Sequence, residues 1–340
     1  MQILVVERGE EPRSGVRKVV VGGGEAGMRL DRFLQRQWPG MPPSAIQRLM
    51  RTGQVRINGG RAKGPDRLAE GDEVRLPPVR PEEPSPEGRG RVVPEWAVAE
   101  VGRRILWEDE ALLVMDKPAG VPVHGGSGQP WGWVDAVRLW WGAEREGIYG
   151  SAPELTHRLD RDTSGCLVMG LTPLAVRHLA GAFKAGAVEK RYLALVRGVP
   201  PPRGSIRQPL TKGVTRGGER MVVAAVDEPG DPAWTDFRVV RRFSGPWGEV
   251  SLVEAHPRSG RTHQIRVHLA WLGHPLAGDG KYGDRELDRR LKGVGMNRLF
   301  LHAARVAFAH PLTGHPVAVE SPLPEALLRV LDGLAQGERA

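Results

Sequence analysis

The amino-acid sequence predicts an α+β protein with a small basic domain and a larger domain built on a mixed, mainly antiparallel sheet. Two observations carry this prediction. After about residue 98, short segments with alternating apolar residues outnumber helical segments, which is typical of an α+β domain. A chain of 340 residues is also long enough for a domain of about 200 residues plus a smaller one, each with its own core.

Composition places the domain boundaries. The stretch 79–97 is rich in Pro, Glu and Gly and almost free of aliphatic residues, so we assign it to a semi-rigid linker. This linker separates a small domain at 26–78 from the larger domain at 98–325. An arm at 1–25 precedes the small domain, and a C-terminal helix and tail at 326–340 follow the large one.

The small domain is predicted to hold two amphipathic helices followed by short strands. Leu30, Phe33 and Leu34 fall at helical spacing, and a second helical stripe begins at Ile46. Five arginines are placed on the polar faces of this unit, and we expect them to contact phosphates: Arg32, Arg36, Arg48, Arg51 and Arg56. The alternative is a solvated basic face without a ligand.

The net charge indicates a polyanionic partner. The chain has 49 Lys and Arg against 40 Asp and Glu, a net charge of +9. Residues 1–80 alone hold 15 basic and 9 acidic residues, so 15 − 9 = +6 of this excess lies in under a quarter of the chain. The small domain is therefore the first candidate for binding nucleic acid.

The compartment is expected to be the cytoplasm. A single cysteine, Cys166, excludes an internal disulfide and a Cys-clustered zinc site, which fits a reducing environment, and we expect its thiol to be buried and inert. No stretch approaches the roughly 20 apolar residues of a membrane span, and the first residues lack the basic-then-apolar order of a secretion signal. We therefore expect no membrane association.

The stretch 155–165 concentrates charged and hydroxyl side chains between apolar flanks. Such a charged turn at the rim of a core is where functional sites are built. Asp160 lies between arginines, and nearby positive charge favours its ionised form, which suits a nucleophile or an electrostatic stabiliser. The alternative is structural: Asp160 and Asp162 cap a turn and pair with Arg158 and Arg161.

Three motifs resemble those of the RluA-type pseudouridine synthases, which isomerise uridine within RNA. They are HRLDRDTSG at 157–165, KRYLALVRG at 190–198 and GRTHQIRVH at 260–268. The segment VHGGSG at 123–128 is similar to the branch that modifies large-subunit ribosomal RNA. The small domain resembles the RNA-binding domain first known from the small-subunit ribosomal protein S4, over about residues 28–77.

The resemblance implies three catalytic residues. Asp160 occupies the position of the family's nucleophile, and Arg266 that of an essential arginine that pairs with the nucleophile. Tyr192 matches a tyrosine that stacks on the flipped base and takes part in proton transfer. The same resemblance implies further substrate-binding residues, and among them Leu301 corresponds to the aliphatic residue that closes the family's pocket. They are His157, Arg158, Arg261, His263 and Leu301.

The implied reaction is an isomerisation, so we expect no cofactor and no metal. We expect the enzyme to be a monomer that acts on RNA and has no membrane partner. His263 and His268 lie five apart, which argues against a shared metal. The glycine-rich segment 278–283 follows no aliphatic strand, so we interpret it as a false nucleotide-binding fingerprint. The Gly-, Pro- and Arg-rich region 200–232 is predicted to be an extended, RNA-facing excursion that becomes ordered on RNA.

Two functions of other classes stay open at this point. One is a non-catalytic RNA-binding ribosome assembly factor that uses the basic domain and keeps the larger one as a scaffold. The other is a metal-dependent RNA hydrolase built on Asp160 and Asp162, although a turn rich in arginine does not suit a two-metal site.

Overall fold

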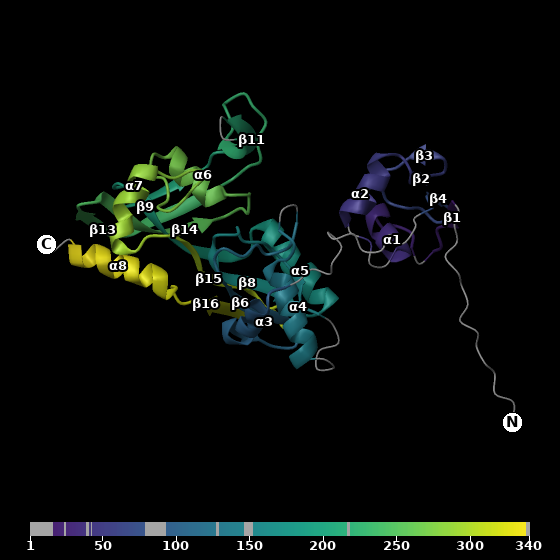
Figure 1. Cartoon of the computed structure of the whole chain (residues 1–340), viewed down its shortest axis with the longest axis horizontal. Helices are drawn as coiled ribbons and strands as arrows, with labels where there is room; N and C mark the ends of the chain where they lie inside the picture. Colours follow the sequence, from purple (N-terminus) through teal and green to yellow (C-terminus); the bar gives the residue numbers. More distant parts are fainter. Residues whose placement is uncertain are drawn as a thin grey trace. The chain divides into compact units, whose positions relative to one another are not determined.

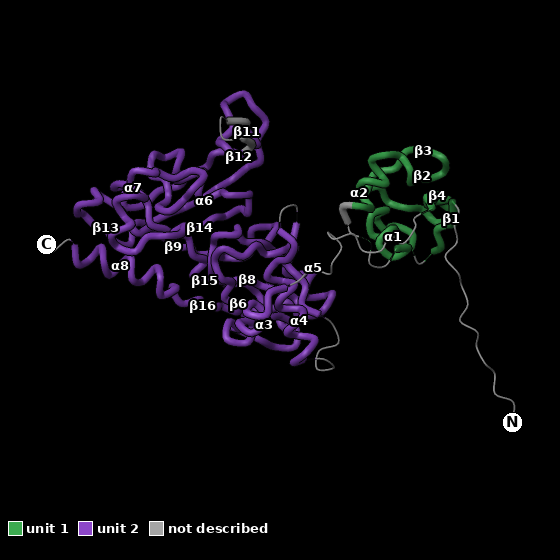
Figure 2. The backbone as a smooth tube through the Cα atoms, in the orientation of Figure 1, with its two compact units in different colours: residues 1–91 green, residues 92–340 purple. Residues whose placement is uncertain are grey.

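A computed structural model describes residues 16–23, 25–38, 41, 43–78, 93–126, 129–145, 152–215 and 218–337. Contacts within the chain divide it into two units, residues 1–91 and 92–340 (Figure 2). Of the predicted linker, residues 79–92 lie outside the described part of the chain, as do Ser127 and Gly128 of the VHGGSG segment.

The small unit is a four-stranded antiparallel sheet with two helices (Figure 1). Its elements are β1 (Arg17–Val20), α1 (Leu30–Gln37), α2 (Pro43–Arg51), β2 (Arg56–Ile57), β3 (Gly60–Arg61) and β4 (Glu73–Leu76), with strand order β1-β4-β2-β3. Leu30, Phe33, Leu34 and Ile46 are buried in its core, as the helical spacing predicted. Strand β1 lies within the stretch 1–25 that we assigned to an arm, and it pairs with β4.

The larger unit is organised around one ten-stranded sheet. Its strands are β5 (Ile105–Glu108), β6 (Leu112–Lys117), β7 (Glu154–Leu155), β8 (Ser164–Gly170), β9 (Glu189–Arg197), β10 (Arg203–Ile206), β13 (Thr235–Gly245), β14 (Gly248–Pro257), β15 (Leu301–Ala309) and β16 (Pro316–Glu320). The main path runs β10-β13-β14-β9-β15-β8-β6-β5. Strand β15 pairs with β8 in parallel, while the other pairs of neighbouring strands are antiparallel. The predicted mixed, mainly antiparallel sheet is confirmed.

Helices cover both faces of this sheet. They are α3 (Glu95–Val101), α4 (Trp133–Glu144), α5 (Pro173–Ala185), α6 (Gln264–Trp271), α7 (Arg285–Leu291) and α8 (Glu325–Gly337), with short 3₁₀ turns at Gly102–Arg104 and Lys292–Val294. Leu167 and Met169 of β8 pack with α3 and α4, whereas Cys166 and Val168 pack with α5. Because successive strand residues point to opposite faces, α4 and α5 lie on opposite sides of the sheet.

Two segments differ from their sequence assignments. Helix α3 begins at Glu95, inside the predicted linker, because its apolar face packs against α4 through Ala97 and Val101. Region 200–232 is not only an excursion: β10 joins the main sheet, and β11 (Leu210–Thr215) pairs with β12 (Gly218–Val223) in a separate hairpin. The hairpin projects from the body of the larger unit (Figure 1). Backbone pairing therefore orders these strands in the chain alone.

The C-terminal helix α8 is part of the core of the larger unit. Leu327 is fully buried among apolar side chains that include Phe243 and Trp247, whereas its neighbour Leu328 is 46% exposed. Leu327→Ala is expected to lower the free energy of unfolding by about 2–5 kcal/mol, since it removes buried methyl groups and leaves a cavity. Leu328→Ala is the matched control, with an expected change of about 0.5 kcal/mol or less. Urea unfolding of both variants measures the difference, and equal effects would place α8 outside the core.

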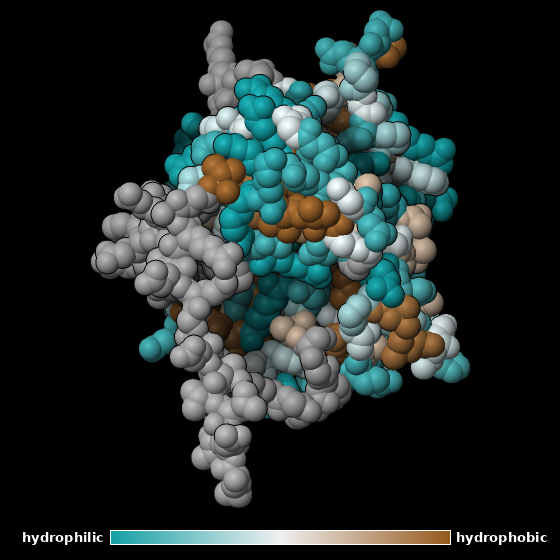
Figure 3. Space-filling model, turned by 90° about the vertical axis from the view of Figure 1, so that its right-hand side faces the viewer, coloured by the Kyte–Doolittle hydropathy of each residue, from teal (hydrophilic) through white to brown (hydrophobic). Residues whose placement is uncertain are grey.

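None of the helices in the part of the chain that the structure describes is long and apolar enough to cross a bilayer. On the face drawn in Figure 3, hydrophilic side chains dominate and hydrophobic ones gather in separate patches, which is ordinary for a globular surface.

Candidate active site

The charged stretch forms a turn that leads into β8. The amide of Thr163 donates to the carbonyl oxygen of Asp160 at 3.2 Å and closes this turn. Gly165 has a φ of 109°, and a Cβ placed there would lie 2.3 Å from the carbonyl oxygen of Ala303. Glycine is required at this position because β15 approaches β8 too closely for any side chain. The close approach of the two strands at Gly165 thus fixes where the turn that carries Asp160 joins β8.

Asp160 lies in a cavity of about 440 Å³. Four cationic side chains line this cavity, together with two imidazoles and the carboxylate of Asp162: Arg158, Arg161, Arg266, Lys281, His124 and His263. The side chain of Asp160 is 17% exposed, so a ligand in the cavity can reach its carboxylate. A carboxylate in the wall of a mainly basic pocket suits an anionic ligand that presents an electrophilic atom.

Arg266 contacts Asp160 directly. Its Nη1 donates to Oδ2 of Asp160 at 3.1 Å, although the two residues are 106 positions apart in sequence. Arg266 lies in the first turn of α6 and is 9% exposed at its side chain. The motif resemblance led us to expect this pair, and the structure brings the two side chains together.

Asp279 holds the other edge of the Arg266 guanidinium, a contact that the sequence analysis missed. Its two oxygens accept from Nε and Nη2 of Arg266 at 2.8 Å each, and its side chain is fully buried. Burial alone would raise the pKa of Asp279, but the bonds to Arg266 and its charge outweigh burial and lower that pKa. Asp279 is thus an ionised, bidentate support for Arg266.

Asp279 lies in the glycine-rich segment 278–283 that we interpreted as a false nucleotide fingerprint. Its Oδ1 also accepts from the amides of Lys281 and Tyr282, at 3.0 and 3.1 Å, so the segment curls around the carboxylate. The segment therefore builds the site through its acidic side chain. The signal in the sequence that could have identified this role is the single acidic residue, Asp279, between two glycines.

His263 and Tyr282 complete the wall beside Arg266. His263 adopts a left-handed backbone with φ 57° just before α6, and its Nδ1 lies 2.8 Å from the hydroxyl of Tyr282. Its Nε2 is 3.9 Å from Oδ2 of Asp160. Burial lowers the pKa of His263 more than Asp160 raises it, so the ring is neutral at pH 7. A neutral imidazole leaves Arg266 as the cation bonded to Asp160.

Tyr192 and Leu301 lie on one face of the sheet next to the turn. Leu301 pairs with Ala194, and Ala303 pairs with Tyr192, so Leu301 and Tyr192 are diagonal neighbours on antiparallel strands. Burial, together with the charge of Asp160, raises the pKa of Tyr192 above its ordinary value of 10.0. The phenol is therefore neutral at physiological pH and near enough to Asp160 to sense its charge.

Lys117 holds the turn that carries Asp160 through a hydrogen bond to its backbone. It is fully buried at the end of β6, and its Nζ donates to the carbonyl oxygens of Pro118, Val121 and Arg161 at 2.6 to 3.0 Å. Burial lowers its pKa to about 7, while the carboxylates of Asp162 and Asp160 favour the ammonium form. The bond to Arg161 ties the Asp160 turn to the loop after β6.

Two residues that the motifs suggested for substrate binding have other contacts. The Nε2 of His157 accepts from the amide of Val168 at 2.9 Å, and its ring stacks on Phe183 of α5 at 4.0 Å. Burial lowers the pKa of His157 to about 3, so it is a neutral packing residue outside the cavity lining. Arg261 is also outside that lining, and its Nε donates to the carbonyl oxygen of Pro232. These contacts support structural roles for both, whereas Arg158 and His263 do line the cavity.

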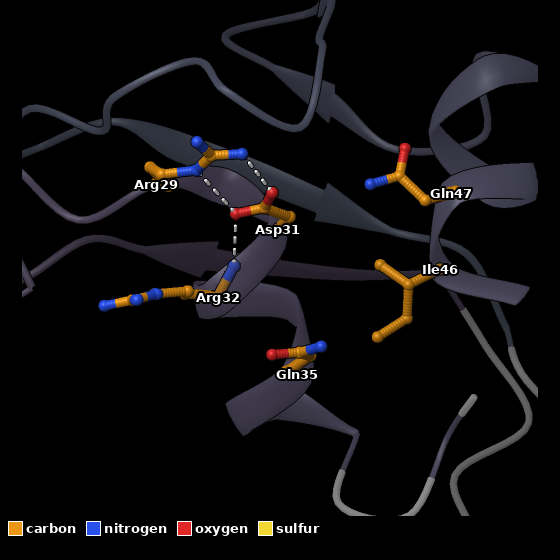
Figure 4. Close-up of a pocket in the computed structure, with 6 residues that line it drawn as sticks. All are labelled: Arg29, Asp31, Arg32, Gln35, Ile46 and Gln47. Atoms are coloured by element: carbon orange, nitrogen blue, oxygen red, sulfur yellow. Dashed lines mark hydrogen bonds and ion pairs between the residues drawn. The ribbon is translucent and has the colours of Figure 1, made fainter. Parts of the chain in front are cut away.

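A second cavity, of about 370 Å³, lies in the small unit between α1 and α2 (Figure 4). Its lining includes Arg32, and at its edge Arg29 forms a bidentate pair with Asp31. The five arginines named from the sequence are all exposed in this unit. Arg56 differs from the rest because its guanidinium donates to the carbonyl oxygens of Gly53 and Gly59.

The polar side chains do not assemble a metal centre in the described part of the chain. No group of three or more His, Cys, Asp or Glu side chains there is arranged to hold a metal ion. Cys166 is buried as expected, and burial raises the pKa of its thiol to about 12.

Comparison with known proteins agrees with this geometry. A family model described as RNA pseudouridylate synthase matches residues 111–271, and a model of the S4 domain matches residues 28–74. Among solved structures, human RNA pseudouridylate synthase domain containing 4 is similar with a TM-score of 0.58 and 26% identity, covering 70% of this chain and 95% of that one. Human RNA pseudouridylate synthase domain containing 1 is similar with a TM-score of 0.53 and 29% identity, over 70% and 94%.

Curated relatives match over nearly the whole chain. Ribosomal large subunit pseudouridine synthase C of Escherichia coli (strain K12) is 43% identical over 322 residues, which cover 94% of this chain and 97% of that protein. The protein of the same name from Yersinia pestis is 42% identical over 317 residues, or 93% and 95%. Identity of this degree over this length shows that the chain belongs to the RNA pseudouridine synthase family, whose members are isomerases.

Proposed function

We propose that this enzyme converts specific uridines of large-subunit ribosomal RNA, of the 23S type, to pseudouridine. The observation that carries the proposal is the contact between Asp160 and Arg266 in the wall of a cavity with four cationic side chains. The names of the relatives that are 42–43% identical support the choice of RNA.

The reaction breaks the bond between the ribose carbon and the uracil nitrogen, turns the freed base, and joins the same carbon to a ring carbon. Asp160 acts as the nucleophile: its carboxylate bonds to the ribose carbon while the bonding pair leaves with the base, and the ring carbon later displaces it. A proton then leaves the ring carbon, and the freed nitrogen takes one up. The uridine must first leave its stack, because none of these atoms is accessible within a helix.

The surrounding residues take distinct parts in this scheme. Arg266 aims the Asp160 carboxylate and keeps it charged, which is an effect of position more than of stability. Tyr192 stacks on the flipped base and lies on the route of the proton from the ring carbon. Leu301 closes the apolar side of the pocket, and Arg158 on the exposed side of the turn occupies the space that the base leaves, since a guanidinium plane stacks well on bases.

No electrons, phosphates or external groups change hands in this isomerisation, so the scheme uses no cofactor. Asp160, Tyr192 and Arg266 all come from one chain, and we propose that the enzyme works as a monomer in the cytoplasm. Partners beyond the RNA are not needed for the chemistry.

The small unit supplies general affinity for RNA. Replacing Arg48 and Arg51 by Gln is expected to weaken binding to any RNA sequence and to reduce the slope of log K against log salt by about 0.7–0.9 for each phosphate that is no longer neutralised. The matched control is Arg329→Gln, since Arg329 is 70% exposed on α8 and its substitution removes one charge far along the sequence from the small unit. Filter binding between low and high salt measures the slopes. If Arg329→Gln reduces the slope by the same amount per charge removed, the effect comes from net charge alone.

The proposed substrate is tested with the purified full-length chain and an unmodified transcript of large-subunit ribosomal RNA. Chemical mapping of pseudouridine is expected to show a small set of defined sites. A small-subunit transcript serves as the control and is expected to stay unmodified. Modification of neither RNA would overturn the proposal and favour a non-catalytic role in ribosome assembly.

A further inference from the structure

Trp234 is an exposed tryptophan that precedes β13 and takes no part in the scheme above. We propose that Trp234, together with Arg207, is a stacking platform for an unpaired RNA base close to the target uridine. The inference rests on the proposed function, because it names how RNA beside the active site is held.

The ring of Trp234 is exposed yet fixed. It is 38% exposed, and its Nε1 donates to Oγ of Ser205 at 2.8 Å and to Oδ1 of Asp236 at 2.6 Å. The guanidinium of Arg207 lies over the ring, 4.0 Å from its centroid. An exposed indole normally loses rotamer freedom when it binds a partner, and here the bonds have already removed that freedom. The ring is thus preorganised for contact.

Hydrogen bonds tie Trp234 to the loop that carries the active-site residues. Its carbonyl oxygen accepts from Nε2 of Gln264 at 2.9 Å, and its amide donates to Oγ of Ser259 at 3.0 Å. Gln264 follows His263 directly and precedes Arg266 by two residues. Since His263 lies 3.9 Å from Asp160, this platform is connected to the catalytic turn through a few bonded residues. In this proposal, the RNA strand whose uridine reaches Asp160 passes Trp234.

The charge around Trp234 fits a phosphate backbone. Arg207 is exposed there, while Arg258 pairs with Asp236 at 2.8 Å and Arg261 with Asp231 at 3.8 Å. Arg207 covers one face of the ring, so a base would stack on the opposite face or on the guanidinium plane itself. An aromatic ring combined with cations is the usual way in which proteins hold single-stranded nucleic acid without reading its sequence. An unpaired nucleotide is thus the occupant that matches both the ring and the charge.

A series of substitutions at Trp234 separates stacking from a structural role. Trp234→Phe keeps an aromatic face but loses the indole N–H, whereas Trp234→Leu loses the face as well. Binding to the RNA substrate is expected to fall roughly 5- to 150-fold for Trp234→Leu, which corresponds to about 1–3 kcal/mol for one stacked base, and to stay within about threefold for Trp234→Phe. The loss is expected in KM for RNA.

Trp107 provides a matched control. It is 42% exposed on β5, at the opposite end of the sheet path from β10, and its Nε1 also donates to an Asp two residues later, Asp109, at 2.9 Å. Trp107→Leu removes a similar ring and a similar bond and is expected to leave RNA binding unchanged. An equal loss in Trp234→Phe and Trp234→Leu would assign the indole to structure and overturn the platform, as would Trp234→Leu binding like the wild type.

Removing single bases from the RNA identifies the partner nucleotide. With the wild-type enzyme, an abasic substitution at one unpaired position beside the target is expected to weaken binding by the same factor as Trp234→Leu, and to have no further effect in that variant. If the abasic substitution and Trp234→Leu weaken binding additively at every position tested, the stacking contact is overturned.

If Trp234→Leu melts at a lower temperature, Arg207→Met replaces it in the same scan. Absence of pseudouridine with wild-type enzyme would reject the proposed function, whereas these binding measurements test the platform separately.

Discussion

Asp160→Asn is expected to reduce pseudouridine formation by at least about 10³-fold, the scale seen when an enzyme loses its nucleophile. The amide keeps the shape of the side chain and can still accept from Nη1 of Arg266, which lies 3.1 Å from the carboxylate. It cannot form the bond to the ribose carbon, because an uncharged amide oxygen is a poor nucleophile. RNA affinity is expected to persist, since Asp160 contributes no positive charge. Single-turnover assays and filter binding measure the two effects.

Asp162→Asn is the matched control for this prediction. Asp162 lies on the same turn, but its side chain is 40% exposed and pairs with Arg161 at 3.0 Å. An exposed ion pair of this kind contributes about 1 kcal/mol or less, so activity is expected to stay within a few fold of wild type. If both variants lose activity equally, the turn as a whole matters and Asp160 has no special role. If Asp160→Asn keeps full turnover, the nucleophile lies elsewhere.

Local patterns were the part of the fold that sequence could predict. The helical spacing of Leu30, Phe33 and Leu34 identified α1, and the stripe that begins at Ile46 identified α2. These signals act within one turn of helix. The order of the strands was not predicted. Strand β15 pairs with β8 through residues such as His302 and Ser164, which are 138 positions apart, and no local pattern encodes that pairing.

The family motifs predicted the contact between Asp160 and Arg266, although it joins two distant segments, but they missed Asp279, which lies outside them. Asp160 and Arg266 came from separate motifs that resemble one family. Asp279 was passed over because Gly-Asp-Gly resembles a loop, and only the fold shows that its carboxylate faces Arg266. His157 was grouped with Asp160 through its place in the motif, yet neighbours in a motif need not face the same way, and its ring packs on α5.

Asp279→Asn is expected to lower kcat about 10²-fold, the effect of a misplacement of roughly 1 Å at a reacting group. The change leaves one oxygen to accept from Arg266 and turns an amide N–H toward the guanidinium, where it repels. Arg266 then loses one of the two 2.8 Å bonds that fix the plane of its guanidinium. Its Nη1 is therefore no longer held in the position from which it bonds to Asp160. RNA affinity is expected to change little, because Asp279 is fully buried. Rates at saturating RNA measure the loss.

Asp288→Asn separates positioning from damage to the loop. Asp288 accepts from the amide of Gly278 at 2.7 Å, so it supports the same segment from the side of α7. Its substitution is expected to affect melting temperature more than kcat. Asp279→Ala, by contrast, leaves Arg266 short of a partner in a site where its side chain is 9% exposed, and is expected to cost about 3–5 kcal/mol of stability. Equal kcat values for Asp279→Asn and Asp288→Asn would deny Asp279 a role in positioning.

Acid gives an independent check on the Asp279 contact. Burial raises the pKa of Asp279 and the Arg266 bonds lower it by more, so its folded-state pKa lies below the ordinary value of 3.8. A carboxyl with a lowered pKa adds stability above its unfolded value, and that stability is lost as the pH falls through the folded-state pKa. The stability difference between wild type and Asp279→Asn is therefore expected to be largest at neutral pH and to shrink in acid below pH 3.8. Unfolding by urea along a pH series measures it, and a difference that persists undiminished in acid would mean that the charge of Asp279 is not what holds Arg266.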